Sequence, residues 1–285
     1  MNTSDTLATA TPDVASGPAP VTSAGAQGLP RLAARRLYAR EPRLAVYGAL
    51  LLGLLLPLAL AWAIDERMVH GANVWTKPMK FALSIAVFAF TTCWFIGHLP
   101  ASRRRGRSVD LVVWLLIASG TFELAYITLQ AGLGEASHYN VGDPFHFAMY
   151  ALMGIGAAVL TATQPMLAWE LYRHGDPGRP AAYRQAVIIG LVLTFVFGAG
   201  VGGLLGGMEP PRTGPRMPLL GWSLQGGDLR PAHFLGIHAA QLLPLVGFVA
   251  VSRRFDRPRL VVWAATLLYV GLFLALVAWG LSGRS

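Results

Sequence analysis

The sequence predicts an all-α membrane protein with seven transmembrane helices. Of its 285 residues, 54% are hydrophobic and only 13% are charged, and the mean hydropathy is +0.50. A soluble domain usually carries about 25% charged residues, whereas about 20 consecutive apolar residues can cross a bilayer as a helix. The segments of that length are about 44–64, 79–98, 109–131, 145–171, 184–206, 233–252 and 259–281.

Basic residues are unequally divided between the two sides of this arrangement. Sixteen of the 23 Lys and Arg residues lie before the first span or in the loops after the second, fourth and sixth spans, and seven lie on the opposite side. Cytoplasmic loops are enriched in Lys and Arg, so we expect the N-terminus inside and the C-terminus outside. The net charge of +9 is then a topology signal. It favours contact with a lipid bilayer and gives no reason to expect a nucleic-acid partner.

The chain opens with a segment that has no apolar periodicity. Residues 1–30 are rich in Ala, Thr, Ser and Pro, so we expect a disordered tail followed by a seven-helix domain over 31–285. Within the first span, Ala59-Leu60-Ala61 is similar to a signal-peptide cleavage site. The apolar stretch is longer than the usual signal-peptide core of about 7–15 residues, and the preceding tail is also too long. We therefore expect this span to be retained.

The second, fourth and sixth spans open with the same short phrase of proline, any residue, lysine or histidine, and phenylalanine. Alternate spans enter the membrane from the same side, so the phrase predicts three hairpins followed by a seventh helix. It also predicts that Lys80, His146 and His233 lie near one outer surface. A shared preference for proline in the first helical turn explains the repeat equally well. The three copies are residues 78–81, 144–147 and 231–234.

The third span carries Ser119, Glu123, Tyr126 and Gln130 on one helical face. Glu123 is the only carboxylate well inside a predicted span, where a charge costs on the order of 2.5–3.5 kcal/mol. It therefore needs a basic partner, for which Lys80 is a candidate, or a bound proton. It lies roughly 12 Å from the outer end of its span at about 1.5 Å per residue, close to the depth expected for His238.

Glycines in the fifth span indicate close helix packing. Gly198, Gly202 and Gly206 are spaced four residues apart, and small residues at that spacing let neighbouring helices approach closely. No strand precedes this cluster, so a phosphate-binding glycine loop is not expected.

The polar residues of the second, third, fourth and sixth spans predict a chamber that opens to the exterior, because the hydrocarbon offers polar side chains no partner. This favours a protein that binds or transports a small anionic or amphipathic molecule, with a lipid as one such ligand. The candidate ligand-binding residues are Lys80, Glu123, Tyr126, His146, Tyr150, Arg230, His233, His238 and Gln241.

A metal- or haem-dependent membrane enzyme is the alternative, because histidine and carboxylate side chains bind metal ions and histidine binds haem iron. The sequence contains no H-E-x-x-H motif, and its single cysteine, Cys93, excludes a cysteine cluster and favours a packing role. Hydrogen bonding between helices also accounts for the histidines. The sequence does not decide between an enzyme and a binding protein. It favours a binding protein, since no complete catalytic motif is present. The candidate metal ligands are Glu123, His146, His233 and His238.

Residues 74–84 and 227–241 resemble segments of uncharacterised bacterial multi-pass integral membrane proteins, and the resemblance covers about residues 70–250. It implies a protein of the bacterial cytoplasmic (inner) membrane with no assigned activity. Rhomboid-like proteases need a Gly-x-Ser-Gly nucleophile, which is absent. Ceramidase-like hydrolases need an H-x-x-x-H pair in the last helix, and the seventh span contains no histidine.

Overall fold

The computed structural model describes residues 24–218 and 220–282, with side chains described from residue 31 onward. Most of this part of the chain is helical. The elements are α1 (Ala24–Arg40), α2 (Pro42–Ile64), β1 (Met68–Val69), β2 (Ala72–Asn73), α3 (Thr76–Ile96), α4 (Ala101–Arg104), α5 (Arg107–Leu133), α6 (Pro144–His174), α7 (Ala181–Gly207), α8 (Arg230–Ile237), α9 (Ala239–Ser252) and α10 (Pro258–Leu281).

Six of these helices, α2, α3, α5, α6, α7 and α10, are long and apolar enough to cross a membrane. Helices α8 and α9 meet that criterion only as a pair, and they are bent by 50° where they join. The prediction of a helical multi-pass membrane protein is therefore confirmed, with six spans, or seven if the bent pair is one span. The continuous helix expected over 233–252 is instead two helices interrupted at His238.

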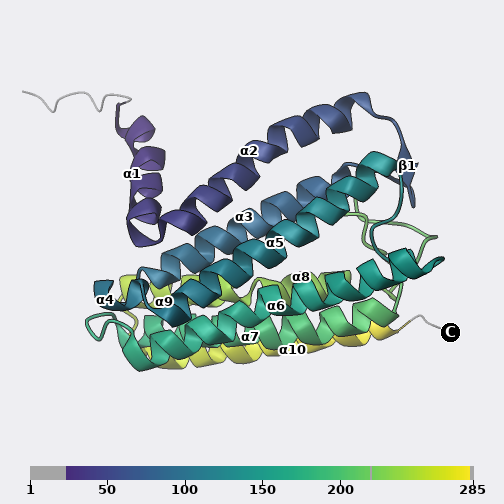
Figure 1. The fold of residues 1–285 in the computed structure, drawn as a ribbon. Coiled ribbons are helices and arrows are strands. Elements are labelled where there is room, and N and C mark those ends of the chain that lie inside the picture. The colour runs from purple at the N-terminus through teal and green to yellow at the C-terminus, as the bar shows by residue number, and fades with distance from the viewer. Residues whose placement is uncertain (1–23, 219, 283–285) are drawn as a thin grey trace, which may run out of the picture.

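Successive spans run in opposite directions, so the loops gather at two ends of the bundle (Figure 1). We call one the hairpin end; it holds the antiparallel β1–β2 pair and the loops 134–143 and 208–229. The arginine-rich end holds α4 and the loops 175–180 and 253–257. Helices α3, α6 and α8 all begin at the hairpin end, which confirms the common entry side predicted from the proline phrase.

Helix α1 lies at the arginine-rich end and runs across the direction of the other helices (Figure 1). It packs against α2 and α3. Of the tail predicted over residues 1–30, residues 1–23 lie outside the described residues, and α1 begins at Ala24.

Asp65 connects the end of α2 to the start of α3. Its carboxylate accepts hydrogen bonds from Arg67 at 2.7 Å and from the indole N–H of Trp75 at 2.8 Å. These bonds hold the pKa of Asp65 below its usual value. Arg67 also donates to the carbonyl of Gly132 at 3.0 Å, near the end of α5. At the hairpin end, these polar side chains thus connect the ends of α2 and α5 with the start of α3.

The break at His238 leaves backbone polar groups that a continuous helix would pair. The N–H of Ala240 donates to Oγ1 of Thr194 in α7, at 2.9 Å. The hydroxyl of Tyr269 in α10 donates to the carbonyl of Leu235. Because an apolar interior offers no water to such groups, these two side chains stabilise the bend.

Two of the three predicted glycines of α7, Gly198 and Gly202, allow α8 to approach closely, whereas a Cβ atom at Gly206 would meet nothing within 4 Å. A Cβ atom at Gly202 would lie 3.3 Å from Cε1 of His233, and one at Gly198 would lie 3.0 Å from Cγ2 of Ile237. A larger side chain at either position would require the neighbouring side chain of α8 to move. Cys93 is free and buried, in agreement with a packing role.

Candidate functional site

The polar stripe of α5 points into the bundle, as its spacing predicts. Ser119, Glu123, Tyr126 and Gln130 are all buried. The amide Nε2 of Gln130 donates to the hydroxyl of Tyr126 at 2.6 Å, one turn away on the same face. Ser119 donates to the backbone carbonyl of Leu115 at 2.6 Å. Three of the four residues therefore have partners within α5 itself.

Glu123 differs from its neighbours on this face. Only 3% of the residue is exposed, and no described group makes a hydrogen bond with its Oε1. A Cβ atom at Gly156 of α6 would lie 2.8 Å from that oxygen. The carboxylate therefore rests against the α6 backbone at a place that only glycine leaves open. The backbone N–H of Ala157 and the ammonium of Lys77 are the groups that act on it electrostatically.

Lys77, in the first turn of α3, connects several polar groups at the hairpin end. It interacts electrostatically with Glu123 and with Arg230, and its Nζ lies 5.9 Å from the centre of the Phe81 ring. Burial, and then Lys77, lower the pKa of His138 to about 3. His138 is therefore a neutral imidazole beside a lysine at neutral pH.

Lys80 has a different environment from the one the sequence suggests. It is exposed, and its Nζ donates to the carbonyl of Leu220 at 3.1 Å, in the loop 208–229. The charged group that acts on it is Arg230. The lysine that acts on Glu123 is thus Lys77, one turn before Lys80. The confinement of both lysines to residues 75–80 is the sequence signal that points to this residue.

Arg230 is paired within its own loop. It donates to Asp228 at 2.6 Å and to the carbonyl of Gly221 at 2.8 Å. Asp228 is fully buried and also accepts from the N–H of Ser223 at 2.9 Å. Burial acts to raise the pKa of Asp228, but the bonds from Arg230 and from the backbone outweigh it and lower that pKa. This arrangement fixes the entry to α8.

His146 belongs to the cap of α6 at the surface. Asp143, the N-cap residue, accepts from the N–H groups of Phe145 at 2.9 Å and His146 at 3.1 Å, and its other oxygen contacts Nδ1 of His146. Nε2 of His146 lies 3.0 Å from Glu135. Glu135, Asp143 and His146 line an open hollow of about 410 Å³. Tyr150 donates to the carbonyl of Gly206 at 2.9 Å and so connects α6 to the end of α7.

His238 and Gln241 connect the broken helix to α3. Nδ1 of His238 lies 3.3 Å from Oε1 of Gln241, whose Nε2 donates to Thr91 at 3.1 Å. Gln164 of α6 donates to the next residue of α3, Thr92, at 3.2 Å. Two glutamines from different helices thus bind adjacent threonines. His233 packs instead against Gly202 of α7.

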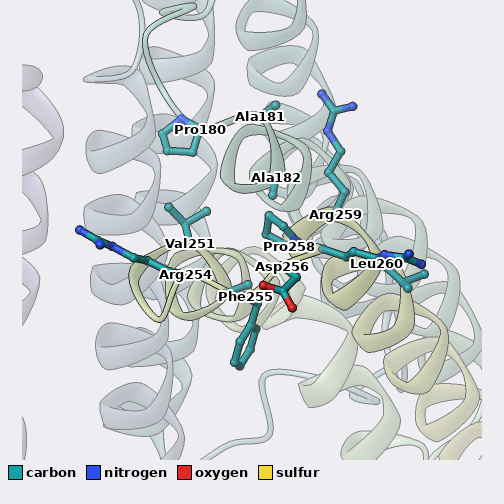
Figure 2. Close-up of a pocket in the computed structure, with 12 residues that line it drawn as sticks. Pro180, Ala181, Ala182, Val251, Arg254, Phe255, Asp256, Pro258, Arg259 and Leu260 are labelled. Carbon is teal, nitrogen blue, oxygen red and sulfur yellow. The ribbon is translucent and has the colours of Figure 1, made fainter.

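A second hollow, of about 580 Å³, lies at the arginine-rich end between the start of α7 and the loop joining α9 to α10. Figure 2 shows Ala182, Val251 and Pro258 around it, with the guanidinium of Arg254 extending away. Its inner lining is mainly apolar, and the hollow is open.

Among the residues that the structure describes, no group of three or more His, Cys, Asp or Glu side chains is arranged to hold a metal ion. The four predicted metal ligands have separate surroundings: Glu123 lies against α6, His146 in a surface cap, His233 against α7, and His238 beside Gln241.

Comparisons with protein-family models, curated proteins and solved structures find no match to this chain. The assignment of the candidate site therefore depends on the geometry of its residues alone.

Proposed function

We propose that this protein binds and transports a small anionic or amphipathic molecule, with Glu123 as the group that exchanges a proton. The observation that carries the proposal is the carboxylate itself: it is almost fully buried in a membrane-length helix, and no described group bonds its Oε1. An ionisable group in such a place is costly and usually functional. A lone structural carboxylate would be expected to have its oxygens bonded.

The broken helix supports transport over mere packing. Secondary transporters commonly use discontinuous helices to form substrate sites within the bilayer. Here α8 and α9 bend by 50° at His238, and the bend is held by side chains of α7 and α10 rather than by proline at the break. Such a bend allows a change of angle without loss of the flanking helices.

The charged residues at the hairpin end suit the approach of an anion. Lys77 and Lys80 each interact electrostatically with Arg230, and a concentration of like charge attracts the opposite charge. We assign the first contact with ligand to Lys80, because it is exposed, and the coupling to Glu123 to Lys77. The other predicted ligand-binding residues stay candidates for the lining of the ligand site. They are Tyr126, His146, Tyr150, His233, His238 and Gln241.

In this proposal the hairpin end faces the exterior and the arginine-rich end faces the cytoplasm, following the distribution of positive charge. The resemblance of residues 74–84 and 227–241 to bacterial integral membrane proteins supports the bacterial cytoplasmic membrane as the location.

The test compares Glu123→Gln with Glu66→Gln, an exposed acid at the hairpin end. Purified protein is titrated from pH 5 to 9 by infrared spectroscopy, and its thermal stabilisation by succinate, benzoate and taurocholate is measured at both extremes. We expect a carboxylic-acid signal and pH-dependent stabilisation in the wild type and in Glu66→Gln. Both should be lost in Glu123→Gln. If Glu123→Gln behaves like Glu66→Gln in both measurements, the proposal is wrong.

A further inference from the structure

Two arginines enclose the short loop that follows α3 at the arginine-rich end. The guanidinium of Arg40 lies 3.5 Å from the centre of the Trp94 ring and donates to the Trp94 carbonyl at 2.7 Å. Its side chain crosses Gly97 so closely that a Cβ there would lie 2.5 Å from Cδ of Arg40. Arg104 donates to the carbonyls of Leu99 at 2.9 Å and Gly97 at 3.0 Å.

A third arginine, Arg179, comes from the loop between α6 and α7. Burial, and then Arg179, lower the pKa of Arg40, and Arg104 acts in the same direction. The Nε of Arg179 is buried and has no hydrogen-bond partner among the described residues. The carboxylate paired with it, Asp176, is half exposed and lies at 3.9 Å. Three guanidinium groups thus share one region with little compensation from carboxylates.

His98 lies beside these arginines, and its backbone carbonyl accepts the N–H of Asp176 at 3.0 Å, in the loop that carries Arg179. His98 is only 4% exposed, and its ring packs against Phe95 at 5.5 Å and Tyr183 at 5.6 Å between ring centres. Its Nε2 is buried and has no partner in the described part of the chain. Burial, and then the surrounding arginines, lower its pKa to about 3. The imidazole is therefore neutral at neutral pH and able to present one N–H as a donor.

From this geometry we infer that Arg40, His98, Arg104 and Arg179 form a binding site for a phosphate group. A buried donor without a partner is costly, and like charges held together repel. A phosphate relieves both, because its oxygens accept several charge-assisted hydrogen bonds at once. Guanidinium groups match that geometry better than ammonium groups do, and all three cations here are arginines.

This site is separate from Glu123, because it lies at the opposite end of the bundle from Lys77 and the β1–β2 hairpin (Figure 1). It therefore does not depend on the proposed transport function. The phosphate has two sources at such a position, a lipid headgroup in the adjacent leaflet or a soluble phosphate. The chemistry recognised is the same in both cases.

The experiment uses full-length protein and two matched double variants. Arg40→Gln/Arg179→Gln removes two charges from the cluster. Arg103→Gln/Arg254→Gln removes two charges from exposed arginines at the same end. Lipid retention is measured by native mass spectrometry after reconstitution into nanodiscs of phosphatidylcholine with phosphatidylglycerol. Thermal stabilisation by inorganic phosphate is measured against chloride at equal ionic strength.

We expect the cluster variant to lose binding about tenfold or more, as for the loss of charge-assisted hydrogen bonds, and the exposed variant to change by about twofold or less. Selective loss of phosphatidylglycerol supports the site with a lipid source. Selective loss of phosphate stabilisation supports it with a soluble source. Equal losses in both variants would overturn it. If the cluster variant does not fold, the wild type decides: the proposal fails if neither phosphatidylglycerol nor phosphate binds to it.

Discussion

Replacing Thr194 with valine removes the oxygen that accepts the N–H of Ala240 at the break between α8 and α9. Valine has almost the same shape, so packing is largely kept. Thr194 is fully buried, so water does not replace the lost acceptor. A buried donor left without a partner costs about 1–3 kcal/mol. Hydrogen bonds measured in membrane proteins average about 0.6 kcal/mol. We therefore expect Thr194→Val to lower the free energy of unfolding by an amount near the low end of that range.

Thr266 supplies a matched control. It is a buried threonine in α10, but its hydroxyl donates to the carbonyl of Val262 one turn earlier in the same helix. That carbonyl already belongs to the regular helical hydrogen-bond pattern, so Thr266→Val strands no backbone group. We expect it to change the free energy of unfolding by about 0.5 kcal/mol or less.

The assay is reversible unfolding in mixed micelles at increasing dodecyl sulfate, followed by tryptophan fluorescence and circular dichroism. A cost of about 1.4 kcal/mol corresponds to a tenfold change in the unfolding constant, which such titrations resolve. The variant Tyr269→Phe removes the second side-chain bond at the break, but the carbonyl of Leu235 still accepts the N–H of His238 at 3.1 Å, so this variant should cost less than Thr194→Val. If Thr194→Val costs no more than Thr266→Val, the bend does not depend on this bond.

Three further predictions test other parts of the molecule. Gly202→Val should destabilise the protein by about 1–3 kcal/mol through overpacking against His233, whereas Gly203→Val, which meets nothing within 4 Å, should not; the same unfolding titration measures both. The pKa values of His98 and His138 are about 3 in the folded protein, whereas a histidine in the unfolded chain has a pKa of about 6.5. Below about pH 6.5 the unfolded chain therefore binds more protons than the folded protein does. Stability should therefore be present near pH 7 and decline as the pH falls through about 6.5, by up to about 2 kcal/mol per histidine at pH 5, and His98→Gln or His138→Gln should flatten that decline. In a Cys93→Ala background, Thr213→Cys should react with an impermeant maleimide added to intact cells and Ser102→Cys should not, and the reverse result would invert the proposed topology.

Local rules explain which features were predictable. The stripe of α5 follows from helical periodicity, which requires no knowledge of the partners of Glu123 or Gln130. The common starting end of α3, α6 and α8 follows from counting spans. The bend at His238 does not follow in this way, because no proline stands at the break and the groups that hold it, Thr194 and Tyr269, lie in other helices.

The features that the sequence did not predict depend on contacts between residues that are far apart in the chain. Lys77 and Lys80 are one turn apart, so only the packing of α3 against its neighbours decides which one acts on Glu123. The region around His98 combines arginines from three separate segments. Each of these arginines has an independent explanation as a marker of the cytoplasmic side, and the sequence alone does not bring them together.

The choice of basic residue at each end bears on both proposals. Both lysines of the chain lie at the hairpin end, where Lys77 acts on Glu123, whereas the cations around His98 are all arginines. An ammonium can give up its proton when its surroundings change, and a guanidinium in a protein does not. A lysine therefore suits a site where charge must change during a cycle, and arginine suits one where charge must stay fixed around a phosphate. Lys77→Arg keeps the charge beside Glu123 but fixes it, so it should shift the pH range over which ligand binds at the hairpin end, while Glu123 still exchanges the proton. Arg179→Lys should weaken phosphate binding without altering pH dependence at Glu123. If each conservative exchange left its own site unaffected, the charge alone would matter, and the assignment of different chemistry to the two ends would be wrong.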